Sequence, residues 1–83
     1  MPPGNGDLLR AAGPLLHGSG WRTALSRDLG VPLRTIERWA SERSPYEPPD
    51  AAMADLLALM ERRAADLDRA AGTIRAALRR RGG

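Results

Sequence analysis

Residues 21–41 read WRTALSRDLGVPLRTIERWAS and contain two short amphipathic segments separated by Gly30 and Pro32. The apolar residues of the first segment recur at helical spacing, which predicts a helix from Trp21 to Leu29. Gly30 stands where a left-handed residue commonly ends a helix. Pro32 suits the first position of the next helix, because the N–H that proline lacks would be unpaired there. Since a single residue separates the glycine from the proline, the two helices must cross steeply.

The second segment predicts a helix from Pro32 to about Ala40 or Ser41 with two unlike faces. Its apolar face must bury together with the preceding helix, and the residues of this joint core are Leu25, Leu29, Val31, Ile36 and Trp39. The opposite face consists of Leu33, Arg34, Glu37, Arg38 and Ser41. Arginine can pair with guanine through two hydrogen bonds, and glutamate can accept one from cytosine. This face therefore predicts base reading by a helix in the DNA major groove.

Five flanking residues suit contacts to the DNA backbone, which position a protein but carry no sequence information. They are Arg22, Thr23, Thr35, Arg43 and Tyr46. For Tyr46, packing against the following helix is an equal alternative. For the charged face itself, the alternative is a solvated surface without a partner.

The stretch Leu25–Val31, LSRDLGV, followed by Arg34–Trp39, RTIERW, resembles the helix-turn-helix of the XRE (lambda repressor/Cro-like) transcriptional regulators. The pattern there is Leu-Ala-x-x-Leu-Gly-Val-Ser-x-x-Thr-Ile-x-x-Trp. This chain departs from it at Ser26, where a small alanine is usual, and at Pro32, where a capping serine is usual. The resemblance implies a sequence-specific regulator of double-stranded DNA, in particular a dimeric (auto)repressor of the small phage or mobile-element type. Anti-CRISPR-associated repressors are similar in size and design.

The residues around this motif predict a small all-α domain over residues 7–48. Residues 1–6 are rich in proline and glycine and are expected to be disordered. A helix is expected from Asp7 to about His17, with a kink or a short break at Pro14. The proline-bearing stretch 41–49 is expected to be a stiff loop.

The last part of the chain predicts one long helix over residues 49–81, about 48 Å long at 1.5 Å per residue, followed by a tail, residues 82–83. Its apolar residues alternate at spacings of four and three, which is a coiled-coil seam: Met53, Leu57, Met60, Ala64, Leu67, Ala71, Ile74 and Leu78. Leu56 and Leu59 lie off this seam and could cover the domain core. The predicted homodimer interface comprises Met60, Ala64, Leu67, Ala71, Ile74 and Leu78, and the spacing leaves parallel and antiparallel pairing open.

Composition narrows the remaining function classes. The 83 residues carry 13 basic and 10 acidic side chains, a net charge of +3, and contain no cysteine and one histidine. These counts argue against a disulfide scaffold, a zinc site, an enzyme, a cofactor or a small-molecule ligand. No apolar run is long enough to predict a membrane span, so we expect a cytoplasmic, nucleoid-associated protein of a bacterium or phage-infected host. Two alternatives stay open: an assembly protein like a phage terminase small subunit, and an antitoxin-type interaction module.

Overall fold

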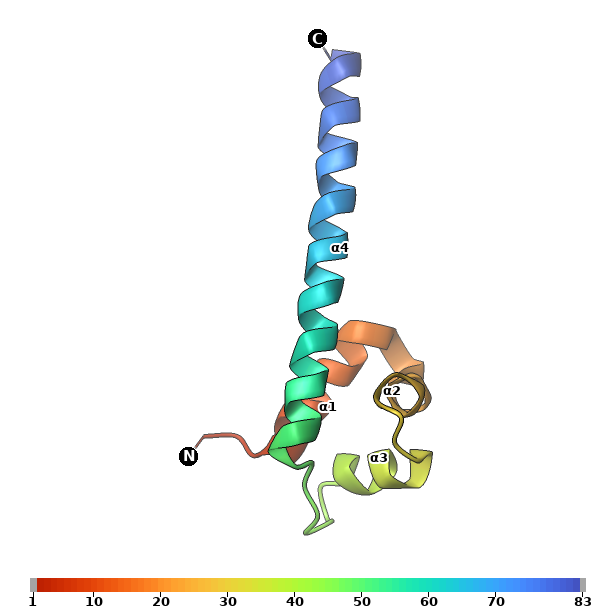
Figure 1. Cartoon of the computed structure of the whole chain (residues 1–83), viewed down its shortest axis with the longest axis vertical. Helices are drawn as coiled ribbons and strands as arrows, with labels where there is room; N and C mark the ends of the chain where they lie inside the picture. Colours follow the sequence, from red (N-terminus) through yellow and green to blue (C-terminus); the bar gives the residue numbers. More distant parts are fainter. Residues whose placement is uncertain (1, 83) are drawn as a thin grey trace.

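The computed structural model describes residues 2–82, which form helices and loops and contain no strand. Helices α1 (Asn5–His17), α2 (Trp21–Leu29) and α3 (Leu33–Ala40) form a small bundle, and α4 (Asp50–Gly82) crosses the bundle and projects far beyond it (Figure 1). A 3₁₀ turn, Gly18–Gly20, joins α1 to α2. The all-α prediction is confirmed. Met1 and Gly83, which belong to the predicted disordered N-terminus and tail, lie outside the described residues.

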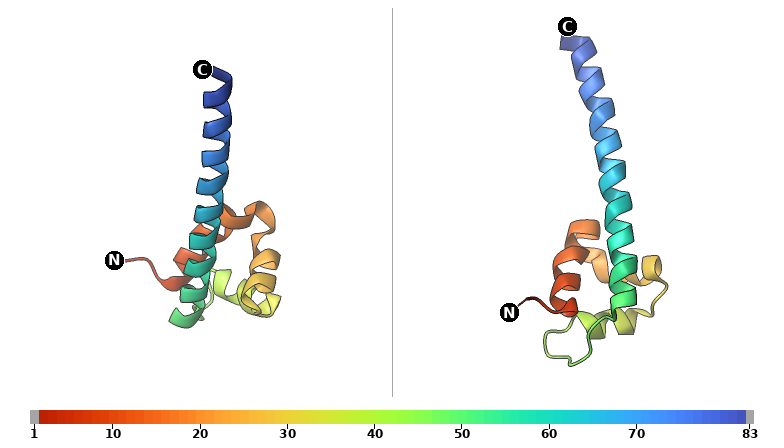
Figure 2. Two further views of the ribbon diagram at one scale, coloured as in Figure 1. Left: turned by 45° about the horizontal axis from the view of Figure 1, so that its top comes forward. Right: turned by 60° about the vertical axis from the view of Figure 1, so that its left-hand side comes forward.

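The core lies where the three short helices meet, and the beginning of α4 covers it (Figure 2). Leu9, Leu25 and Ile36 are fully buried, and Leu56 of α4 is buried against them. The other buried apolar residues are Ala12, Leu16, Trp21 and Ala40. Of the predicted joint core, Leu25 and Ile36 are buried as expected, whereas Leu29, Val31 and Trp39 are half-buried at its edge.

Helix α1 begins at Asn5, two residues before the expected start, so Asn5 and Gly6 are ordered rather than part of a disordered end. The side chain of Asp7 accepts a hydrogen bond from the Gly4 N–H at 3.2 Å, which satisfies a backbone donor at the helix start. The Asn5 amide donates to the carbonyl oxygen of Pro48 at 2.8 Å and to the Asp50 carboxylate at 2.9 Å. These two bonds fasten the first turn to the loop before α4.

Helix α1 also continues through Pro14 to His17, so the short break considered there does not occur. Only three residues follow the proline, and the C-terminal turn has other partners for its carbonyl groups. The Gly18 N–H bonds to the Pro14 carbonyl oxygen, and Arg63 of α4 donates to that of Leu16 at 3.2 Å. The helix thus continues past Pro14, although proline cannot donate to the carbonyl oxygen of Arg10.

The turn between α2 and α3 is fixed by backbone geometry and by one side chain. Gly30 is left-handed, with φ 65° and ψ 33°, as predicted. The hydroxyl of Ser26 donates to the Val31 carbonyl oxygen at 2.6 Å, and the Val31 N–H donates to the Ser26 carbonyl oxygen at 3.1 Å. Pro32 lies one residue before α3 rather than at its first position, and its carbonyl oxygen accepts from Thr35 and Ile36.

Helix α4 changes character along its length. Leu56 is buried, and Met53, Leu59 and Met60 are half-buried against the core, so its first turns close the bundle as expected. From residue 61 onward almost every residue is exposed. Across residues 2–82, no helix is both long and apolar enough to cross a membrane.

Candidate nucleic-acid interface

Helix α3 lies at the end of the molecule opposite the C-terminus of α4 (Figures 1 and 2). Within the described chain its backbone lies close to α1 and α2, whereas the backbone of α4 lies close to those two helices but not to α3. Ile36 and Ala40 form its buried side. The five residues predicted to read bases are all exposed on the rest of the helix and at its C-terminal cap: Leu33, Arg34, Glu37, Arg38 and Ser41. The bundle therefore presents this whole face to solvent.

The charged groups of this face are free to contact a partner. None of the ion pairs found within residues 2–82 involves Arg34, Glu37 or Arg38. The side chains of Arg34 and Glu37 also have no hydrogen bond to another described residue. Because the two arginines are four residues apart, they lie one above the other along the helix. Helix α3 thus carries two neighbouring guanidinium groups with unused donors.

Arg38 is oriented by an aromatic ring. Its guanidinium carbon lies 5.2 Å from the ring centroid of Tyr46, within the range of a cation–π interaction. Tyr46 is exposed, and its backbone N–H donates to the hydroxyl of Ser44 at 3.1 Å. The structure thus gives Tyr46 a role beyond the two considered from the sequence, phosphate contact and packing against the following helix. Its ring lies beside α3, next to an arginine of the predicted reading face.

The other predicted backbone-contacting residues lie on α2, on α3 and in the following loop, and they differ in exposure. Arg22 and Thr23 are exposed in the first turn of α2, where the guanidinium of Arg22 lies 4.6 Å from the Trp21 ring. Thr35 is half-buried, so it presents less of its side chain than the others. Arg43 is exposed in the loop after α3, and its N–H approaches the Ser41 hydroxyl at 3.4 Å.

Sequence reasoning missed the polar contacts that hold α3 in place. Arg10 of α1 donates to the carbonyl oxygen of Ala40, the last residue of α3, at 3.3 Å, and it also pairs with Asp7. His17, at the end of α1, lies 2.7 Å from the Asp28 carboxylate near the end of α2. The sequence offers one signal for these contacts, the basic residue His17 close to the C-terminus of α1. This signal does not identify the helix with which His17 pairs. These contacts fasten α1 to both α2 and α3.

The residues predicted for dimerisation do not share one environment. Met60 is half-buried against the core of its own chain, so only part of its side chain remains available. The others, Ala64, Leu67, Ala71, Ile74 and Leu78, are exposed along the projecting part of α4. Leu57, on the same seam, is exposed as well. From Ala64 to Leu78 the seam is therefore an uncovered apolar stripe beyond the bundle.

The chain matches no protein-family model, and no curated protein or solved structure is significantly similar to it. Within residues 2–82, no group of three or more histidine or acidic side chains is arranged to hold a metal ion.

Proposed function

We propose that this chain is a sequence-specific, double-stranded DNA-binding transcriptional regulator in which α2 and α3 form a helix-turn-helix. The observation that carries the proposal is the unpaired face of α3, with two arginines and a glutamate, held at one end of the molecule by buried Leu25 and Ile36. A helix that enters the major groove needs such a face and a firmly set crossing angle behind it.

In this proposal α3 lies in the major groove, and its side chains contact different bases. Arg34 and Arg38 donate to guanine, and Glu37 accepts from cytosine. Leu33 meets a thymine methyl group, and Ser41 bonds to either partner of a base pair. Backbone phosphates are bound by the surrounding residues Arg22, Thr23, Thr35 and Arg43. Tyr46 contributes by holding the Arg38 guanidinium in place.

The proposed regulator is a homodimer, because a single α3 contacts only a few base pairs. A two-fold dimer doubles these contacts on an inverted-repeat operator. Each arginine–guanine pair supplies roughly 1–3 kcal/mol of discrimination, so the dimer reaches a specificity that one subunit does not. The exposed apolar stripe of α4 supports dimerisation. Bound at a promoter, such a dimer excludes polymerase, and repression of its own gene, as in small phage repressors, follows from occupancy alone.

The proposal is tested by selecting bound duplexes from a random DNA pool with the purified protein and sequencing them after several rounds. An enriched inverted repeat is the expected result. Binding that enriches no sequence and fades as salt rises reflects phosphate contacts alone and contradicts the proposal. In that case a ring of many subunits would favour a DNA-binding assembly protein, and a tightly co-purifying neighbouring gene product would favour an antitoxin-type module.

A further inference from the structure

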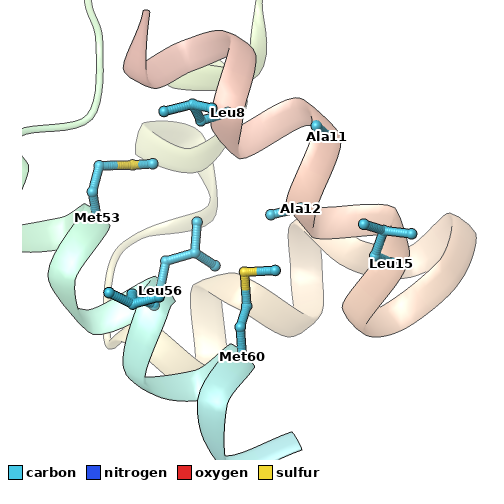
Figure 3. A pocket seen from close by; sticks show the side chains of 8 residues that line it. Leu8, Ala11, Ala12, Leu15, Met53, Leu56 and Met60 are labelled. Atoms are coloured by element: carbon cyan, nitrogen blue, oxygen red, sulfur yellow. The ribbon is translucent and has the colours of Figure 1, made fainter. Parts of the chain in front are cut away.

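An apolar groove lies between α1 and the beginning of α4, and no residue of α3 lines it. Figure 3 shows α1 side chains on one side of it and α4 side chains on the other. Its volume is about 350 Å³, and its lining is Leu8, Ala11, Ala12, Leu15, Met53, Leu56, Leu57 and Met60. Leu15 is 81% exposed, and Leu8 and Leu57 are exposed as well. An aliphatic groove with such open walls gains stability only when another apolar surface covers it.

This groove is continuous with the apolar stripe of α4. Leu57 and Met60 line the groove and also belong to the seam. Farther along α4, Leu67, Ile74 and Leu78 are 63%, 60% and 59% exposed. Groove and seam together form one uncovered surface that extends over most of the length of α4. A partner must therefore be long, straight and apolar at a spacing of 3.5 residues, and α4 itself has these properties.

We propose that α4 of a second copy covers the groove and the seam in a parallel, in-register pairing, so that α1 forms part of the dimer interface. This inference rests on the proposed function and deepens it. Parallel pairing places both α3 helices at one end of the dimer and both C-termini at the other, because α3 lies opposite the C-terminus of α4 (Figure 1). Only then do both α3 helices reach the same duplex. Antiparallel pairing places them at opposite ends.

Charges beside the seam favour the same arrangement. Arg63 directly precedes the seam residue Ala64, and Asp68 directly follows Leu67. In a parallel in-register pair, Arg63 of each copy lies beside Asp68 of the other, which gives two attractive contacts and no like-charge contact along the seam. Within its own chain, Arg63 donates a hydrogen bond from one guanidinium nitrogen to the Leu16 carbonyl oxygen, and its other donors remain available.

Antiparallel pairing that covers the same length is less favourable. A register that matches Ala64 with Ile74 brings Glu61 beside Arg75, which is attractive, but it also brings the two copies of Asp68 together. It further leaves the two α1 grooves at opposite ends of the assembly. The parallel pair brings both grooves to the same end, where Leu57 of each copy lies against the groove of the other.

Disulfide cross-linking tests the orientation directly, because the chain has no cysteine of its own. Three single variants are prepared, Ala64→Cys, Ile74→Cys and, as a control on the outer face of α4, Arg69→Cys. Under mild oxidation without DNA, Ala64→Cys and Ile74→Cys should each form covalent dimers with themselves, whereas Arg69→Cys should not, since a disulfide needs Cα atoms about 4.4–6.8 Å apart. Cross-linking only in a mixture of Ala64→Cys and Ile74→Cys, identified by the mass of the heterodimer, would establish antiparallel pairing and overturn the proposal. Absence of cross-links at both seam positions would overturn it as well.

The role of α1 is tested with Leu15→Arg, a change at a side chain that the fold leaves exposed. The dimer dissociation constant, measured by sedimentation, should rise at least tenfold, while Ala65→Arg on the outer face of α4 leaves it unchanged. Equal dimerisation of both variants would show that the groove is not in the interface. These measurements are independent of DNA: a parallel dimer that enriches no DNA sequence refutes the proposed function, and a DNA-selecting protein that cross-links antiparallel refutes only the pairing.

Discussion

A Cβ atom added to Gly13 would lie 2.1 Å from Cε3 of Trp21, so the indole ring of α2 packs directly on the backbone of α1. Both residues are buried. The absence of a side chain at Gly13 is what lets the two helices approach, and Trp21 fills the space that a larger residue would take. The pair thus sets the position of α2, and through the turn at Gly30 the position of α3.

Replacement of Gly13 by alanine should lower the free energy of unfolding by about 1–3 kcal/mol, because the added methyl group overlaps the Trp21 ring. Urea denaturation followed by circular dichroism measures this. Gly72→Ala is the matched control: nothing lies within 4 Å of its added Cβ, and alanine favours a helix by about 1 kcal/mol. A Gly13→Ala protein as stable as the wild type would contradict the close packing.

Replacement of Ser26 by alanine should cost about 0.5–1.5 kcal/mol of stability, because it removes the hydrogen bond from the Ser26 hydroxyl to the Val31 carbonyl oxygen. Alanine differs from serine only by the missing hydroxyl, so the effect isolates the hydrogen bond. Ser19→Ala in the exposed 3₁₀ turn serves as control in the same denaturation assay. An unchanged or raised stability of Ser26→Ala would show that the turn does not depend on the hydroxyl.

Local signals made the centre of the fold predictable, and distant contacts account for the misses. The turn and its core are predicted by residues within a dozen positions of one another, namely Leu25, Gly30 and Ile36. The early start of α1 depends instead on bonds from Asn5 to residues 43 and 45 positions away. Leu8 and Leu15 are seven residues apart and share a face of α1, and both are exposed where they line the groove between α1 and α4.

In the candidate site, too, local sequence predicts some features, whereas others depend on contacts between distant segments. The face of α3 follows from helical periodicity, so its five residues could be identified from the sequence. The placement of Tyr46 beside Arg38 could not, because it depends on how the proline-bearing loop folds back and on its tether to Asn5. The α1–α4 groove could not be predicted from the sequence either, because it forms only when two segments distant in sequence pack together.

Arg34→Ala and Arg38→Ala should each weaken binding to the selected DNA by about 5- to 150-fold, the equivalent of roughly 1–3 kcal/mol for one arginine–guanine contact. Helix content should not change, because both side chains are exposed. Arg69→Ala, which removes the same charge from the outer face of α4, should leave specific binding nearly unchanged. Fluorescence anisotropy with specific and scrambled duplexes measures the difference. Equal losses for all three variants would mean that net charge, rather than base reading, drives binding.

Tyr46→Ala should weaken specific binding by about 2- to 5-fold, because an exposed cation–π contact supplies about 0.5–1 kcal/mol and orients Arg38. Tyr46→Phe keeps the ring and should bind like the wild type. Combining Tyr46→Ala with Arg38→Ala should cost no more than Arg38→Ala alone, since the ring acts through that arginine. If Tyr46→Phe is as weak as Tyr46→Ala, the hydroxyl contacts DNA directly and the positioning role is wrong.

Leu67→Glu combined with Ile74→Glu should convert the proposed dimer into a monomer, because it would place two charges of each copy in the proposed apolar interface. Both residues project from the part of α4 beyond the bundle, so the thermal unfolding of the bundle should remain cooperative. Sedimentation velocity gives the oligomeric state, and Ala65→Glu on the outer face of α4 controls for added negative charge.

The monomer should still contact a single half-site but lose the steep preference for an inverted repeat, since only one α3 remains per molecule. A double variant that sediments as a dimer would move the interface away from the seam, and a monomer that keeps the full preference for the inverted repeat would show that dimerisation does not contribute to operator recognition.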